Sequence, residues 1–369
     1  PPCPRPWPRR GCWASIGSPS LQRPAVENSL DELAQLTFSA NAIVIGRRIQ
    51  TKPHPDPALY VGSGFVRELK QQLAEAGGNC VIFDDTLSPA QQRNLETELE
   101  CKVIDRPILI LDIFATRART AAARLQVELA QLEYTLPRLT GAWVHFSRQY
   151  GGIGAKGPGE TQLEIDRRQV RTKIAHLKQR LQKLDRQRST QRKRRQDLFK
   201  VALVGYTNAG KSTLFNLLTK ADVRTEDMLF TTLDSTTRVM SSGYPCHVVF
   251  SDTVGFIKKL PHELVESFKS TLEEVSLADL LLLVVDCSEA NFEQRIEHTR
   301  QVLAEIGADN IPYLLICGKI VVAGDFVARR ENHHKVFMIS ARERLGIAAI
   351  QAEILANSAQ FIKKRSVFS

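Results

Sequence analysis

The chain has 369 residues, of which 43% are hydrophobic and 24% charged, as is ordinary for a globular protein of more than one domain. Its longest apolar run, at about residues 280–285, is far shorter than the roughly 20 residues that cross a bilayer, so a membrane-spanning helix is excluded. Seven scattered cysteines without a C-x-x-C pair argue against a disulfide scaffold or a zinc cluster and indicate the cytoplasm.

Short apolar runs alternate with helical stretches between residues 41 and 112. Strands are expected at 42–45, 80–83 and 102–105, with helices at 65–75 and after Ser88-Pro89, where the serine suits an N-cap and the proline the first helical position. This order predicts a small parallel α/β domain over residues 28–115. Residues 1–27 mix Pro, Arg and Trp without such a pattern, so we expect a disordered leader there.

Two leucine-rich stretches carry the spacing of a coiled-coil seam. Apolar residues recur at alternating intervals of four and three from Leu125 to Leu139, and again from Val170 to Leu184. Both seams are buried most simply in a helical hairpin over residues 116–197, with Pro137 ending or kinking the first arm. Five glycines within residues 151–159 predict a loop at the tip, which is either a ligand-approaching loop or a plain connector.

The positive charge of the chain is concentrated in the second arm. Residues 167–200 hold 14 Lys and Arg against Asp185 and Asp197, in a chain whose total net charge is +10. Such a block attracts polyanions, and nucleic acid is the usual partner, although a solvated helix face is the simpler alternative.

From about residue 198 the pattern becomes that of a nucleotide-binding α/β domain, which we expect over residues 198–369. Strands are predicted at 200–204, 248–251, 280–286, 313–316 and 336–339. The first is followed by Gly205-Tyr-Thr-Asn-Ala-Gly-Lys-Ser212 and then a helix, which matches a phosphate-binding loop in both residues and context. Its backbone N–H groups are expected to cradle phosphates, Lys211 to neutralise the β- and γ-phosphates, and Ser212 to bind Mg²⁺.

Two further segments have the form of G-protein switch elements. Asp252-Thr-Val-Gly255 follows a second apolar strand, so Asp252 suits the Mg²⁺ shell and the Gly255 backbone N–H suits the γ-phosphate. Between the motifs, Phe230-Thr-Thr-Leu-Asp234 supplies a threonine that completes the metal shell in the triphosphate state, and Thr232 is preferred to Thr231. Lys211, Thr232 and Gly255 are therefore the predicted catalytic residues, and Ser212, Thr232 and Asp252 the predicted metal ligands.

These motifs together resemble the HflX family of translation-associated GTPases. The resemblance rests on residues 206–211, 229–234, 252–257 and 260–265, and in the first half on Ser88-Pro-Ala-Gln91, Val103-Ile-Asp-Arg106 and Gly157-Pro-Gly-Glu-Thr-Gln-Leu-Glu164. It implies a small α/β domain with a helical hairpin, followed by a G domain that binds GTP or GDP with Mg²⁺. It further implies action on the large ribosomal subunit, through the basic arm and glycine-rich loop, and the splitting or rescue of stalled ribosomes. We expect a cytoplasmic monomer.

Two residues bear on the expected mechanism. Phe256 stands where many small GTPases place the glutamine that orients the attacking water, so we expect slow intrinsic hydrolysis, or simply a packing role for this ring. Asn208 resembles the asparagine with which some such GTPases hold a monovalent cation, so K⁺ is a further expected cofactor.

The guanine-reading motif departs from the family pattern. Asn-Lys-x-Asp is expected after the strand at 313–316, but the chain has Gly318-Lys-Ile-Val321, which keeps only the lysine. Losing a hydrogen-bonding discriminator usually costs orders of magnitude in selectivity. Relaxed use of ATP and GTP, a weakly binding natural variant and a damaged gene copy are the open explanations.

The leading hypothesis is a Mg²⁺-dependent GTPase of the large ribosomal subunit. The alternative is a ribosome- or RNA-binding protein with a degenerate nucleotide pocket, and a third hypothesis is an ATPase acting on RNA structure. The predicted nucleotide-binding residues are Gly205, Tyr206, Thr207, Asn208, Ala209, Gly210, Lys211, Ser212, Thr213, Phe230, Thr231, Thr232, Leu233, Asp234, Asp252, Thr253, Val254, Gly255, Gly318, Lys319, Ile320, Val321, Ser340, Ala341 and Arg342.

Overall fold

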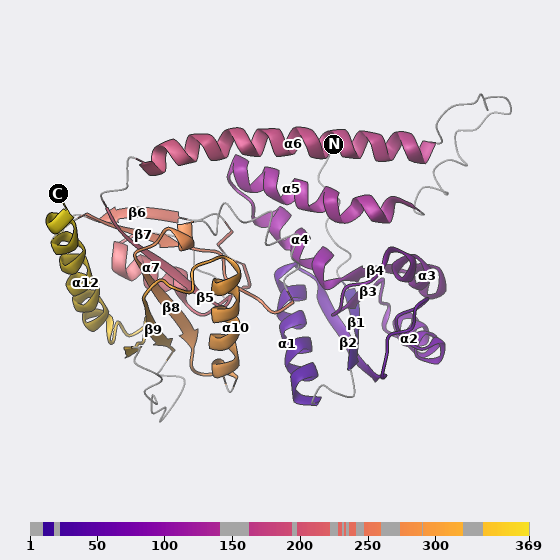
Figure 1. Ribbon diagram of the computed structural model, residues 1–369. Coiled ribbons are helices and arrows are strands. Elements are labelled where there is room, and N and C mark those ends of the chain that lie inside the picture. The colour runs from indigo at the N-terminus through magenta and orange to yellow at the C-terminus, as the bar shows by residue number, and fades with distance from the viewer. Residues whose placement is uncertain are drawn as a thin grey trace. The chain divides into compact units, whose positions relative to one another are not determined.

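The computed structural model describes residues 10–17, 23–140, 162–193, 198–221, 228–230, 232–233, 236–240, 247–259, 274–289, 291–319 and 335–368 (Figure 1). The chain forms two compact units, one of Pro1–Thr116 with Arg124–Leu181 and the other of Arg117–Ala123 with Gln182–Ser369. The expected division into three domains, with boundaries near residues 28, 116 and 198, stays a prediction.

The first unit is built on a parallel sheet of four strands. β2 (Ile43–Thr51), β1 (Arg10–Gly17), β3 (Cys80–Phe83) and β4 (Lys102–Asp105) lie side by side in that order. The helices are α1 (Arg23–Ser39), α2 (Ser63–Ala76), α3 (Pro89–Leu99) and α4 (Arg106–Arg117). The strands predicted at 80–83 and 102–105 are confirmed residue for residue. The N-cap at Ser88 is also confirmed, because its hydroxyl accepts a hydrogen bond from the backbone N–H of Gln91.

The prediction of a disordered leader is wrong for Arg10–Gly17, which forms β1 in the interior of the sheet. β1 pairs in parallel with β2 on one side and with β3 on the other. β1 lies between β2 and β3, which do not pair with each other, so its backbone groups hydrogen-bond to both strands. Its sequence includes Trp13 and Ile16, which favour strands but are flanked by the Pro- and Arg-rich composition on which the prediction was based.

A buried ion cluster joins α1, the end of β3 and the start of α4. The guanidinium of Arg106 lies 2.5 Å from a carboxylate oxygen of Glu32 and 2.6 Å from one of Asp84. Ser29 donates its hydroxyl to the second oxygen of Asp84. Burial disfavours the charge on Arg106, but the two carboxylates outweigh it and hold the pKa of the guanidinium above its usual value. Three elements distant in sequence are therefore tied through one side chain.

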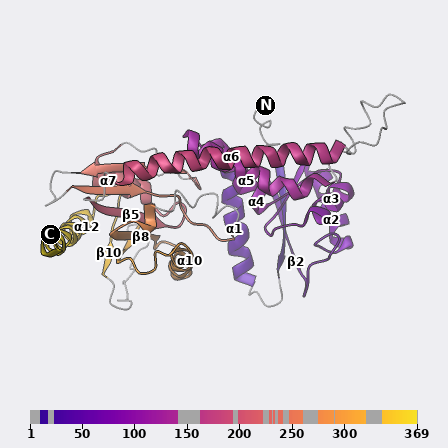
Figure 2. The ribbon, with the colours of Figure 1, turned by 45° about the horizontal axis from the view of Figure 1, so that its top comes forward.

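The two predicted seams lie on α5 (Ala121–Thr135) and α6 (Gln162–Lys193), which run close together in both Figure 1 and Figure 2. Leu125, Leu129 and Leu177 are buried, and ion pairs join Lys173 to Glu128 and Lys178 to Glu133. The first arm ends at Thr135 and continues as the 3₁₀ helix η1 (Leu136–Thr140), so the expected break at Pro137 is confirmed. The glycine-rich residues 151–159 lie outside the described residues.

The second unit is built on a sheet of six strands in the order β10, β9, β8, β5, β7, β6. These strands are β5 (Phe199–Gly205), β6 (Thr236–Met240), β7 (Val248–Asp252), β8 (Leu280–Asp286), β9 (Tyr313–Gly318) and β10 (Val336–Met338). All pairs are parallel except β6 with β7. The helices α7 (Lys211–Thr219), α10 (Phe292–Glu305) and α12 (Ile347–Phe368) complete an α/β fold, which confirms the predicted fold class. The sequence did not reveal β6.

Throughout the part of the chain that the structure describes, each helix is too short or too polar to cross a lipid bilayer.

Replacing Arg106 with alanine is expected to lower the free energy of unfolding of the first unit by about 3–5 kcal/mol, because two buried carboxylates would lose their counter-charge. Arg47→Ala is the matched control, because its partner Asp31 is exposed and such pairs contribute about 1 kcal/mol or less. Urea unfolding followed by circular dichroism measures both. Equal shifts in the two variants would contradict the structural role of the cluster.

Candidate functional site

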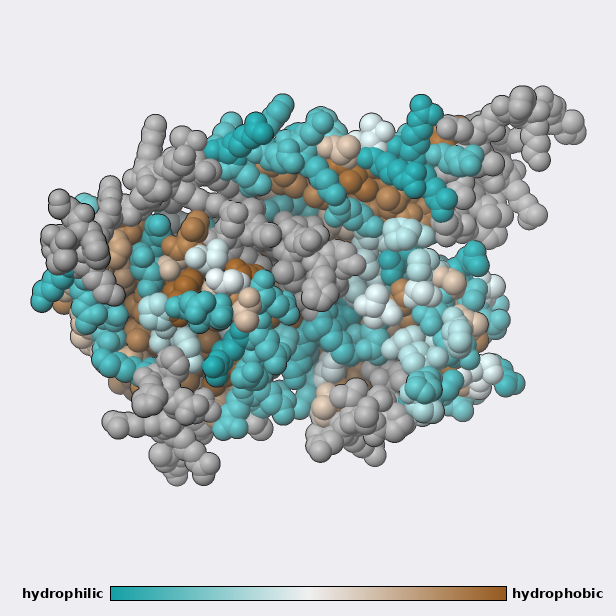
Figure 3. All heavy atoms as spheres, viewed as in Figure 1, coloured by the Kyte–Doolittle hydropathy of each residue, from teal (hydrophilic) through white to brown (hydrophobic). Residues whose placement is uncertain are grey.

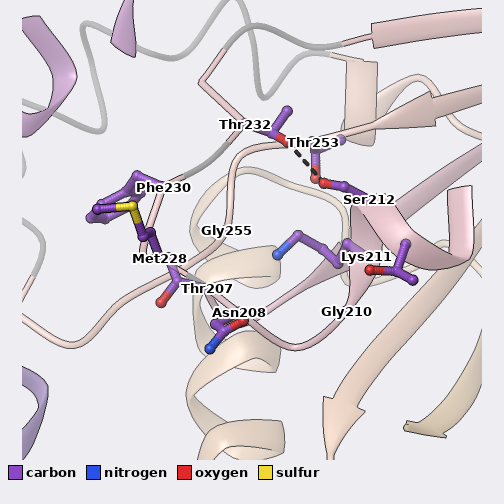
Figure 4. A pocket seen from close by; sticks show the side chains of 11 residues that line it. Thr207, Asn208, Gly210, Lys211, Ser212, Met228, Phe230, Thr232, Thr253 and Gly255 are labelled. Carbon is purple, nitrogen blue, oxygen red and sulfur yellow. Dashed lines mark hydrogen bonds between the residues drawn. The ribbon is translucent and has the colours of Figure 1, made fainter. Parts of the chain in front are cut away.

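The phosphate-binding loop connects the end of β5 to the start of α7. Gly205 has φ +143°, and a Cβ there would lie 2.1 Å from the carbonyl oxygen of Val284, so only glycine fits. Gly210 has φ +93° and immediately precedes the first residue of α7. Figure 4 shows the side chains of Thr207, Asn208 and Lys211 around the resulting cavity. The loop thus opens the N-terminus of α7 toward a space suited to an anion.

The three predicted metal ligands converge on one point. The hydroxyl of Ser212 lies 2.8 Å from the hydroxyl of Thr232 (Figure 4). Oδ2 of Asp252 lies 2.6 Å from the Ser212 hydroxyl and 3.1 Å from the Thr232 hydroxyl. Burial raises the pKa of Asp252, and hydrogen bonds from Ser212 and the charge of Lys211 oppose that rise. Its Oδ1 is buried without a hydrogen-bond partner in the described structure. These oxygens suit Mg²⁺, a hard cation that binds oxygen ligands.

Lys211 is the buried cation of the site. Its ammonium donates to the backbone carbonyls of Tyr206, at 2.7 Å, and Gly205, at 3.1 Å. Burial lowers its pKa to about 8, and the charge of Asp252 opposes this. An anion in the cavity would favour the charged lysine and raise this pKa. Anion binding should therefore be strongest below pH 8 and weaken as the free lysine loses its proton above that value.

The segment after Asp252 is held against the phosphate loop. The N–H of Phe256 donates to the carbonyl of Gly205 at 3.0 Å, and the N–H of Thr207 donates to the carbonyl of Phe256 at 2.8 Å. A Cβ on Gly255 would lie 2.7 Å from Cα of Thr207 and 2.9 Å from Nζ of Lys211, so a glycine is needed for this approach. The ring of Phe256 is 3% exposed and packs in the core of the second unit. A buried ring cannot orient water, which agrees with the packing role expected for it.

Met228, Phe230 and Thr232 bring the first switch segment to the same cavity. Leu229, Phe230 and Leu233 are buried, and Phe230 has φ +57°, an uncommon value for a residue with a side chain. The guanidinium of Arg117, which is the last residue of α4 and the first of the stretch Arg117–Ala123 of the second unit, lies 3.1 Å from the sulfur of Met228. Thr231 and Asp234 lie outside the described residues.

The residues predicted to bind the base lie where β9 and β10 end. The N–H of Ile339 donates to the carbonyl of Cys317 at 2.8 Å, which sets Ser340-Ala341 beside Gly318-Lys319. Ser340 is buried, and its hydroxyl accepts a hydrogen bond from the N–H of Glu343. Arg342 is exposed, and Ile320 and Val321 lie outside the described residues. Of the predicted base-side residues, four are therefore positioned at one edge of the sheet: Gly318, Lys319, Ser340 and Ala341.

Three residues that the structure brings to this site are not apparent from the sequence motifs. Asp286 pairs with Lys319, Met228 lines the cavity, and Arg117 contacts Met228. Asp286 ends a fully buried strand, which is a signal for a site residue in parallel sheets. Nothing in the sequence around Arg117 or Met228 would have identified them.

These features define a P-loop nucleoside triphosphatase of the G-protein class. They are a phosphate loop at the end of a parallel strand, a cluster of oxygen ligands suited to Mg²⁺ and two switch segments. Models of three consecutive family regions match this chain: "GTP-binding GTPase N-terminal" over residues 27–115, "GTP-binding GTPase Middle Region" over 117–195 and "50S ribosome-binding GTPase" over 200–319.

Curated relatives give the family. GTPase HflX of Flavobacterium psychrophilum is 48% identical over 313 residues, which cover 83% of this chain and 75% of the relative. GTPase HflX of Escherichia coli is 46% identical over 324 residues, covering 86% and 76%. The chain belongs to the HflX family of GTPases, so the predicted resemblance and the predicted enzyme class are confirmed. The SsGBP and GDP complex, at 22% identity and a TM-score of 0.50 over 95% of this chain and 99% of that one, shares the fold.

Gly255→Ala is expected to slow GTP hydrolysis by about tenfold or more while changing GDP affinity much less, because the methyl group would push the segment Asp252–Gly255 away from the γ-phosphate position. Single-turnover hydrolysis and equilibrium GDP binding measure the two effects. Gly64→Ala is the control, since a Cβ at Gly64 in α2 meets nothing within 4 Å. Wild-type hydrolysis by the Gly255 variant would show that this glycine is not needed.

Proposed function

We propose that this chain binds GTP and GDP together with Mg²⁺, hydrolyses the γ-phosphate, and works in the cytoplasm as a monomer on the large ribosomal subunit. The observation that carries the nucleotide part is the convergence of Ser212, Thr232 and Asp252 beside Lys211. The chain's membership of the HflX family supports the same activity.

Each residue of the site has a defined part in this proposal. Ser212, Thr232 and Asp252 would hold Mg²⁺, and the bound ion would neutralise negative charge on the phosphates. Lys211 neutralises the β- and γ-phosphates from inside the loop, and the N–H of Gly255 donates to the γ-phosphate. Thr232 belongs to a switch segment, so its contact with Mg²⁺ would form in the triphosphate state and be released in the diphosphate state. Phe256, at the position of the water-orienting glutamine, has no polar side-chain atom and is buried, so we expect slow intrinsic hydrolysis.

The ribosomal part of the proposal rests on α6 and on the family models. Arg168, Arg171, Arg180, Lys183 and Arg186 are exposed on α6, and Figure 3 shows hydrophilic side chains along this helix. A row of exposed cations suits the phosphates of rRNA. The model matched by residues 200–319 describes a 50S ribosome-binding GTPase. Splitting or rescue of stalled ribosomes, with the glycine-rich residues 151–159 as a second contact, is the biological role that we propose.

A second candidate function is a ribosome- or RNA-binding protein whose nucleotide pocket no longer selects guanine. The observation that favours it is Gly318, which provides no side chain where the family motif has asparagine, together with Val321 in place of the aspartate. The residues proposed to bind the phosphates and Mg²⁺ are present. The expected mark of this candidate is therefore weak or relaxed nucleotide binding, rather than loss of the fold.

Titration with fluorescent GTP and ATP, followed by phosphate release with and without large ribosomal subunits, separates the candidates. We expect binding of GTP, slow release alone and faster release with subunits. Lys211→Ala is expected to reduce phosphate release by about 100-fold, because the transferred phosphate would lose the buried ammonium that neutralises its charge.

Binding of neither nucleotide would overturn the enzyme proposal, whereas equal affinity for GTP and ATP would show that base selection is lost. No response to ribosomal subunits would overturn the ribosomal part alone. Turnover in Lys211→Ala at the wild-type rate would place the activity outside this site.

Potassium is the remaining part of the proposal. Asn208 lines the cavity with φ +60°, and an amide oxygen there would suit a monovalent cation beside the phosphates. Hydrolysis is expected to be faster in KCl than in NaCl of equal concentration, and Asn208→Ala should remove the difference. Equal rates in the two salts would exclude a K⁺ site.

A further inference from the structure

Asp286 is a buried carboxylate at the base side of the site. It is the last residue of β8 and is 3% exposed. Its Oδ2 lies 2.6 Å from the ammonium of Lys319, whose side chain is 38% exposed. A charged hydrogen bond of this length with one buried partner is stronger than a surface ion pair. The lysine that remains from the guanine-reading motif is therefore held from the neighbouring strand.

The position of Asp286 is itself fixed. Its Oδ1 accepts hydrogen bonds from the hydroxyl of Ser288 at 2.5 Å and from the N–H of Ser288 at 3.1 Å. Asp286 is paired with Gly318 in the parallel register of β8 and β9, and the N–H of Cys287 donates to the carbonyl of Gly318 at 3.3 Å. One oxygen of Asp286 is thus bound within its own turn, and the other is directed at Lys319.

The backbone of Lys319 is in an uncommon conformation. Its φ is +59°, in the left-handed region that residues with a side chain rarely adopt. Strained conformations persist where surrounding contacts determine them. The ion pair with Asp286 is such a contact.

The family motif has an asparagine before this lysine, at the position that Gly318 occupies here. A Cβ on Gly318 would lie 3.5 Å from the carbonyl oxygen of Ala209 and 3.4 Å from that of Val285, which is ordinary van der Waals contact. Because Ala209 belongs to the phosphate loop, an asparagine here could donate its amide to that loop. Glycine has no side chain for such a link, so Gly318 contributes none to the phosphate loop.

We infer that Asp286 is a positioning residue that holds Lys319 in place for the base of the bound nucleotide, in the absence of the asparagine link. The inference rests on the proposed nucleotide binding. It adds that the base side of this chain is organised from β8, through a lysine that lies along a purine ring without selecting guanine by itself.

A double-mutant cycle with fluorescent GDP tests the inference. Asp286→Asn and Lys319→Met are each expected to weaken GDP binding by about tenfold, and the combined variant no more than Lys319→Met alone, because both changes remove one interaction. A merely structural role of Asp286 would make the two effects multiply. Glu353→Gln, which removes the exposed pair with Lys335 in the same unit, should leave the affinity unchanged.

Gly318→Asn supplies the rescue. Added to Asp286→Asn, it is expected to recover most of the lost affinity, since it restores a link to Ala209. If Asp286→Asn does not fold, GDP affinity is compared between Gly318→Asn and Gly318→Asn/Lys319→Met. Lys319→Met should then weaken GDP binding less than it does in the chain with Gly318.

Multiplying effects in the cycle, or wild-type GDP affinity in Asp286→Asn, would overturn the inference. Failure of Gly318→Asn to recover affinity, or to reduce the effect of losing the lysine, would overturn it too. A wild-type chain that binds neither GDP nor GTP would instead overturn the proposed function, so the two failures are distinguishable.

Discussion

The parallel pairing of β5 with β7 and β8 is the constraint on which the site depends. Leu203 is paired with Asp252 and Gly205 with Val284, so the phosphate loop, the metal carboxylate and the turn after β8 begin at one edge of the sheet. The strands are buried and approach so closely that Gly205 tolerates no Cβ. A shift of one residue in the pairing of β5 with β7 would turn Asp252 away from Ser212, because side chains alternate across a sheet.

Much of this arrangement could be predicted from the sequence. Buried strands and the motifs that follow them are local features, and a parallel sheet brings the carboxyl ends of its strands together. Ser212, Asp252 and Lys211 therefore follow from motif and context. Thr232 required more, since the path of its segment depends on the burial of Leu229, Phe230 and Leu233. The preference for Thr232 agrees with its contacts, although its role in the metal shell stays a prediction.

The features that escaped prediction depend on contacts between distant segments. β1 is recognisable only once β2 and β3 are seen to lack pairing with each other, and β6 only from its antiparallel pairing with β7. Asp286 gains its role from the register of β8 with β9, and Arg106 from meeting Glu32 and Asp84 across 74 and 22 residues of sequence. Local periodicity carries no information on such pairs.

The two sides of the nucleotide site differ in what a substitution can damage. On the phosphate side the loop conformation and Gly255 set the positions of backbone groups, and Lys211, Ser212 and Asp252 occupy a strand end and the first turn of a helix. On the base side, discrimination requires particular side chains at the end of β9 and just after it, and Gly318 is the last residue of that strand. This separation explains how a chain 48% identical to a GTPase HflX can lack the motif asparagine and aspartate. In the proposed function, phosphate chemistry and base selection depend on different residues, and the substitutions at Gly318 and Val321 affect those of base selection.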